Sequence, residues 1–209
     1  MKLTRVFLLL LAGCAALVHA QAQAADTAPD VLVKNVTDEV LQIIRSDKGI
    51  QAGNNQKAIA LIEAKVLPHF NFAHMTQLAV GHDWKAASGA QQKQLADEFH
   101  ALLVRTYAKA LTEYKNSSIK FKPFKMGSGE GDVEVRTDVM QAGGKSISLD
   151  YFLEKLPTGW TVFDIEVDGI SLVTNYRNSF AAEVRSGGID GLIKSLHSKN
   201  GSGAESGQK

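Results

Sequence analysis

Apolar and polar residues alternate along much of the segment from Ile119 to Val167, and this alternation limits the fold more than any other feature of the chain. Successive side chains of a β-strand point to opposite faces, so the pattern predicts strands with one apolar and one polar face. Gly143-Gly144 and Pro157-Thr158-Gly159 carry the residues typical of hairpin turns. We therefore predict a four-stranded antiparallel meander that is polar on one face and covered by helices on the other.

Apolar residues at helical spacing precede the predicted sheet. They predict amphipathic helices over residues 32–44 and 59–67, then a short helix over residues 70–80. Ser88 and Gln91 have the spacing of a capping box at the start of a long helix that runs to Tyr114. Helices on one side of an antiparallel sheet give the fold class α+β.

Two further helices are predicted after the last strand, over residues 172–185 and 189–196, separated by Gly187-Gly188. Residues 198–209 contain no apolar residue larger than alanine, so we expect a disordered tail. The chain is thus expected to fold as one domain over residues 25–197.

The N-terminus has the features of a secretory signal peptide. Basic residues at positions 1–5 precede an apolar run over residues 6–18, and Ala20, Ala22 and Ala24 offer Ala-x-Ala cleavage sites. We therefore expect residues 1–24 to be removed after export. Residues 11–14 also form a lipoprotein-type box ending in Cys14, so lipidation at that cysteine is the alternative.

The charge of the exported chain argues against nucleic acid as a partner. Without residues 1–24, the chain keeps 21 of its 23 basic residues and all 22 acidic residues. Proteins that bind nucleic acid usually have an excess of basic residues that contact the phosphate backbone, and this chain has no such excess.

The predicted polar face of the sheet holds most of the titratable groups. Its members share the outward position of the alternation: Glu134, Arg136, Asp138, Ser146, Ser148, Asp150, Glu154, Asp164, Glu166 and Asp168. A catalytic pocket needs polar groups that converge on the inward face, where only Tyr151 is predicted. We therefore expect no catalytic residue, and an enzyme of the NTF2-like type is the less favoured alternative.

No metal site or other cofactor is predicted. The histidines at positions 69, 74, 82, 100 and 197 lack the spacing of metal ligands, and cleavage after Cys14 would leave no cysteine. Four lysines at positions 115, 120, 122 and 125 form either a solvated surface or, beside a pocket mouth, a site for phosphate or an anionic membrane.

The inward apolar residues either fill a solid core or line a ligand cavity, and periodicity alone leaves both possibilities open. Two blocks of sequence favour the cavity. Residues 160–180 with 188–196, and residues 66–88 with 99–111, resemble the MlaC family of toluene-tolerance lipid carriers. The resemblance covers nearly the whole exported chain and implies an NTF2-like-related fold with a lipid cavity between sheet and helices.

The resemblance implies a periplasmic, monomeric carrier of diacyl phospholipid that maintains outer-membrane lipid asymmetry. Its implied partners are an inner-membrane ABC transporter complex with its substrate-binding membrane subunit and an outer-membrane lipoprotein complex. A periplasmic adaptor with a solid core, acting through protein contacts alone, is the competing class. The resemblance assigns the inward apolar residues to the cavity wall: Phe99, Leu102, Leu103, Tyr107, Val135, Val139, Ile147, Leu149, Tyr151, Leu153, Phe163, Ile165, Val167, Ile170, Leu172, Val173, Tyr176 and Phe180.

Overall fold

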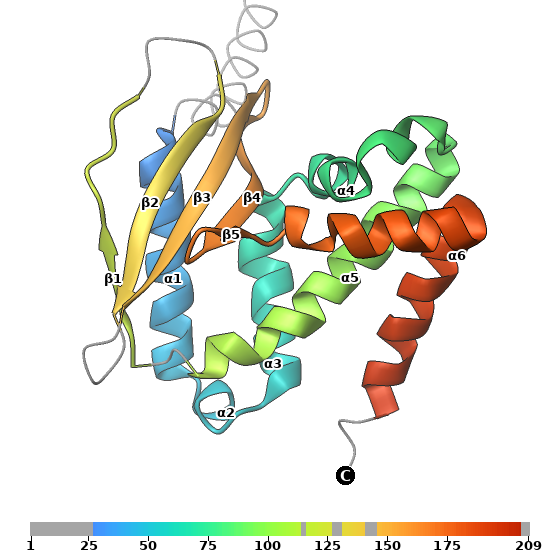
Figure 1. Ribbon diagram of the computed structural model, residues 1–209. Helices are drawn as coiled ribbons and strands as arrows, with labels where there is room; N and C mark the ends of the chain where they lie inside the picture. The colour runs from blue at the N-terminus through green and yellow to red at the C-terminus, as the bar shows by residue number, and fades with distance from the viewer. Residues whose placement is uncertain (1–26, 114–115, 127–130, 141–145, 206–209) are drawn as a thin grey trace, which may run out of the picture.

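The computed structural model describes residues 27–113, 116–126, 131–140 and 146–205. The predicted signal peptide, Cys14 and Lys115 lie outside these residues. Figure 1 shows the sheet on one side of the molecule, with α1 running behind β2 and β3, and with α4, α5 and α6 gathered on the other side. The predicted α+β class is confirmed.

The helical part contains six α-helices and several short helical turns in the described residues. Helix α3 continues through a π-helical turn (Ile62–Val66) and a 3₁₀ turn (Leu67–His69), and 3₁₀ turns also follow α4 (Gly81–Ala86) and precede α6 (Thr174–Tyr176). The α-helices are α1 (Pro29–Ser46), α2 (Lys48–Gln51), α3 (Asn55–Leu61), α4 (Phe72–Val80), α5 (Gly89–Glu113) and α6 (Arg177–Glu205).

Polar side chains define where these helices begin. Asp47, Asn54 and Asn71 accept hydrogen bonds from backbone N–H groups in the first turns of α2, α3 and α4. At the start of α5 the predicted capping box is confirmed, because Ser88 N–H donates to Gln91 Oε1 at 2.9 Å and Gln91 N–H donates to Ser88 Oγ at 3.3 Å. These bonds satisfy donors that helix termini otherwise leave unpaired.

The sheet is an antiparallel meander in the order β1-β2-β3-β4-β5. Its strands are β1 (Ser118–Phe121), β2 (Val133–Met140), β3 (Ser146–Leu156), β4 (Gly159–Val167) and β5 (Ile170–Ser171). The first four are the predicted strands, and β5 is an addition. It forms because Asp168 and Gly169 adopt φ angles of 49° and 77°, the left-handed pair of a tight hairpin turn.

Two apolar cores hold the layers together. Val33 of α1 packs with Val135, Leu153 and Val162 on the covered face of the sheet. The second core lies among α4, α5 and α6, where Phe99 is one of the fully buried side chains. The helices therefore cover one face of the sheet, as predicted.

Helix α6 is kinked where the sequence predicts a break, because Gly188 has a φ of 67°. The predicted disorder from Ser198 is wrong as far as Glu205, since α6 extends to that residue. Asn200 is only 9% exposed, and its amide donates to the backbone and side-chain oxygens of Glu98 at 3.0 and 2.6 Å. The hydropathy of the tail does not reveal a polar tertiary contact of this kind, so the extension of α6 was not predicted.

Candidate functional site

An apolar cavity of about 500 Å³ lies between the covered face of the sheet and the helices α1, α4 and α5, with residues 62–70 contributing a further wall. Its volume falls within the range of small-molecule binding sites. The lining residues are Leu32, Val33, Val36, Thr37, Val40, Leu41, Ile44, Ile62, Val66, Leu67, His69, Phe70, Phe72, Met75, Leu103, Val104, Tyr107, Ala110, Ile119, Val139, Ile147, Leu149, Tyr151, Val162, Ile165, Val167 and Leu172.

Nine of the eighteen residues predicted as cavity wall line this cavity. Most come from strands, where alternate residues face the helices, and the others lie on α5 and just after β5. They are Leu103, Tyr107, Val139, Ile147, Leu149, Tyr151, Ile165, Val167 and Leu172. Whether they contact a ligand remains a prediction.

Seven other predicted residues are buried in the two cores or packed against them, and the cavity lining does not include them. Phe99, Val173 and Phe180 are buried in the core among α4, α5 and α6, and Leu102 and Tyr176 pack against it. Val135 and Leu153 are buried in the core between α1 and the sheet. Apolar spacing identifies a buried residue, but it does not distinguish a filled core from a cavity wall.

The last two predicted residues, Phe163 and Ile170, are also placed away from the cavity. A register shift between β3 and β4 makes Phe163 an extra residue in its strand, and its ring stacks on His74 with 4.7 Å between ring centres. Ile170 follows the tight turn into β5 and is 62% exposed. A bulge and a two-residue turn both re-aim side chains without changing the alternation in the sequence.

Two walls of the cavity were not predicted from the sequence. One is the inner face of α1, which contributes residues from Leu32 to Ile44. The other comprises residues from Ile62 to Met75. The amphipathic pattern of both segments was visible, and the missing information was which other element each apolar face covers.

Four polar side chains reach the described lining: Thr37, His69, Tyr107 and Tyr151. Burial raises the pKa of Tyr151 to about 12, and the neighbouring Thr37 hydroxyl only partly offsets this rise. Burial also raises the pKa of Tyr107, with the neighbouring Tyr176 hydroxyl adding to the effect. Burial lowers the pKa of His69, opposed by the charge of Glu39. These shifts keep each group neutral, so the described wall presents no charge near neutral pH.

The outward face of the sheet is largely as predicted, with one exception. Glu134, Arg136 and Asp168 are exposed, whereas Asp164 is only 7% exposed. The Asp164 carboxylate accepts hydrogen bonds from the Ser171 hydroxyl and from the N–H groups of Ile165 and Val173. Asp164 therefore ties β4 to the segment that leads into α6, and it is a structural residue.

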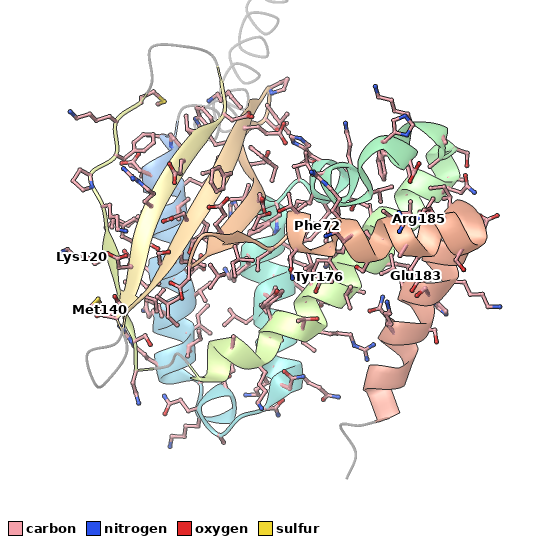
Figure 2. The ribbon with its side chains drawn as sticks, viewed as in Figure 1. Phe72, Lys120, Met140, Tyr176, Glu183 and Arg185 are labelled. Carbon is pink, nitrogen blue, oxygen red and sulfur yellow. The ribbon has the colours of Figure 1, made fainter. Side chains whose placement is uncertain are left out.

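The lysines described by the structure do not line the cavity. Figure 2 shows Lys120 projecting from the edge strand β1, away from the helices. Lys122 pairs with Asp138 at 2.9 Å, and Lys125 is exposed. These three lysines form a solvated surface.

Within the described ranges, no group of three or more histidine, cysteine, aspartate or glutamate side chains is arranged to hold a metal ion. No helix in the same part of the chain is long and apolar enough to cross a membrane. The distinctive site of the described structure is thus an uncharged, apolar cavity.

Comparison with known proteins gives consistent matches. Residues 34–198 match the model of a family described as MlaC protein. The intermembrane phospholipid transport system binding protein MlaC of Haemophilus influenzae is 24% identical over 175 residues, covering 82% of each chain. Toluene tolerance protein ttg2D of Pseudomonas putida is 28% identical over 106 residues, covering 51% of this chain and 49% of its own length.

A solved structure is also similar. It is the phospholipid-binding protein of Ralstonia solanacearum in complex with a phospholipid. The two chains are 38% identical and superpose with a TM-score of 0.79, over 85% of this chain and 99% of the other.

Proposed function

Because the chain belongs to the MlaC protein family, we propose that it is a soluble phospholipid carrier of the periplasm, with no catalytic activity. The observation that carries the proposal is the cavity of about 500 Å³, whose described lining is apolar and free of charged groups. Such a wall suits acyl chains and leaves the charged head group outside. The phospholipid bound by the similar Ralstonia solanacearum protein supports this cargo.

The energetics of such a cargo fit a carrier. At about 0.8 kcal/mol per methylene, two chains of roughly sixteen carbons represent over 20 kcal/mol of gross transfer from water, which exceeds any real affinity. Escape into water is therefore negligible. A bilayer is as apolar as the cavity, however, so exchange with a membrane has a small net free energy and its direction must come from partners.

The partners that we propose follow from the family. The chain, exported by residues 1–24 and acting as a monomer, would pass lipid between an outer-membrane lipoprotein complex and an inner-membrane ABC transporter complex with its substrate-binding membrane subunit. This transfer would maintain outer-membrane lipid asymmetry. With no charge in the described lining, selectivity among head groups should be weak.

Mass spectrometry of the purified protein tests the proposal. Denatured protein should release about one phospholipid molecule per chain, and Leu149→Glu should lower that occupancy because Leu149 lines the cavity. Glu166→Gln on the outward face is the matched control and should leave the occupancy unchanged. Protein that carries no lipid and takes none up from vesicles would support the solid-core adaptor instead.

A further inference from the structure

The apolar cavity follows strands β3 and β4, and its two ends differ. At one end it is lined by Ile147 and Val167, where β3 begins and β4 ends. The partner of Val167 across the β4–β5 turn is Ile170, which is 62% exposed. This end of the cavity therefore lies near solvent, and we call it the outer end.

The other end of the cavity meets filled protein. Its lining includes Val162, near the start of β4, and Val33 of α1, which are both buried members of the core between α1 and the sheet. Met75 and Leu103 also line the cavity, and they are buried members of the core among α4, α5 and α6. The cavity thus stops where the two cores begin, and we call this the inner end.

Phe70 lies where the two cores meet. Its side chain lines the cavity and packs against both cores. Its backbone is anchored to β4, because Phe70 forms a bridge to Val162 and the following N–H, of Asn71, donates to the Val162 oxygen at 2.8 Å. The Phe70 ring stacks on Phe72 at the start of α4 (Figure 2), and Phe72 meets His100 of α5, with 5.9 and 4.6 Å between the respective ring centres. A ring that is backed by packed protein in this way resists displacement by a ligand.

A wall of this kind limits the length of an enclosed chain. If the head group of the cargo stays at the outer end, in solvent, the methyl ends of the acyl chains point toward Phe70. A chain longer than the cavity leaves methylenes in water at the outer end, and each lowers binding about three- to fourfold relative to a bilayer. We infer that Phe70 closes the inner end of the cavity and sets the greatest acyl-chain length that the carrier accepts. This inference rests on the proposed function and adds to it a selectivity for chain length.

A series of phospholipids that differ only in chain length tests the inference. Vesicles contain equal amounts of phosphatidylcholines whose two identical chains carry one cis double bond and range from about fourteen to about twenty-four carbons. The purified exported protein is incubated with these vesicles and separated from them, and its bound lipids are quantified by mass spectrometry. Wild-type protein should load the shorter members evenly up to a length limit. Above that limit, loading should fall about tenfold or more from one even-numbered member to the next.

Matched variants separate Phe70 from the rest of the protein. Phe70→Ala removes the phenyl ring, and a benzene-sized space of about 150 Å³ admits about six chain carbons. The length limit should therefore rise by about three carbons in each chain if both chains reach the ring, or by about six if only one does. Phe70→Leu removes less and should raise the limit by about half as much. Phe163→Ala is the control and should keep the wild-type limit, because Phe163 stacks on His74 and is not part of the lining.

The possible outcomes distinguish the inference from the proposed function. Even loading of the whole series by wild-type protein would overturn the inference, as would a limit that Phe163→Ala raises and Phe70→Ala leaves in place. If Phe70→Ala does not fold, an unchanged limit in Phe70→Leu overturns the inference equally. Uptake of none of the lipids by wild-type protein would reject the proposed carrier function itself, and the inference with it.

Discussion

Leu153 of β3 and Val162 of β4 lie directly opposite each other, one position out of step with the neighbouring pair of Phe152 and Asp164. The shift leaves Phe163 as an extra residue and turns Val162 toward the helices. The backbone of residues 70–71 lies beside this part of β4, where Asn71 N–H donates to the Val162 oxygen at 2.8 Å. A bulge at a strand edge that another segment covers is a stable arrangement.

The bulge predicts opposite effects for two adjacent residues. Val162→Thr adds a hydroxyl to the cavity wall and should lower phospholipid occupancy about threefold or more, because a polar group without a partner is poorly tolerated there. Phe163→Thr introduces the same side chain on the other face and should leave occupancy near the wild-type value. Lipid extraction and mass spectrometry measure both variants, and a larger loss in Phe163→Thr would contradict the register.

Asp164 should matter for stability more than its predicted outward position implies. Asp164→Asn retains only one acceptor oxygen for the three donors that the carboxylate now serves, so we expect a loss of about 1–3 kcal/mol in the free energy of unfolding. Urea denaturation measures the change. Asp97→Asn is the control, because Asp97 is an exposed partner of Lys93 and such pairs contribute about 0–1 kcal/mol. Equal effects of the two variants would refute the structural role of Asp164.

Phe99 tests the distinction between solid core and cavity wall. Its ring is fully buried and meets Tyr176 and Phe180 edge to face, with 5.2 Å between ring centres in each pair. Phe99→Ala should therefore reduce the free energy of unfolding by about 3–5 kcal/mol. The protein that remains folded should still carry phospholipid, as native mass spectrometry can establish. Loss of lipid from folded Phe99→Ala protein would place Phe99 in the binding site after all.

Much of the fold could be predicted because its signals are local. The alternation of β2 and β3, the capping box at Ser88 and the helix break at Gly188 each depend on residues close together in the chain, and each appears in the structure. The β5 strand and the helical end of α6 could not be predicted in the same way. β5 has only two residues, too few for an alternation to show, and the end of α6 depends on the contact of Asn200 with Glu98.

The cavity was less predictable because its shape depends on which elements face each other. The strand residues Leu149 and Ile165 follow from alternation, but the α1 residues opposite them follow only from tertiary packing. Phe180 shows the converse error, since it has the spacing of a wall residue and lies in a filled core.

Alkaline pH provides a test of the Tyr151 environment that requires no lipid analysis. Its pKa is raised from an ordinary value of 10.0 to about 12 in the folded protein, with burial as the main cause. Between these values the unfolded chain loses the phenol proton while the folded chain keeps it, so folding stability falls as the pH rises. The stabilisation is complete below about pH 10 and is lost by about pH 12, a change of about 2–3 kcal/mol.

Tyr151→Phe lacks this titration and should lose less stability than the wild type over the same range in urea denaturation. Other tyrosines and lysines titrate in both proteins, so the difference between the two curves isolates Tyr151, and parallel curves would show that its phenol is not enclosed as described.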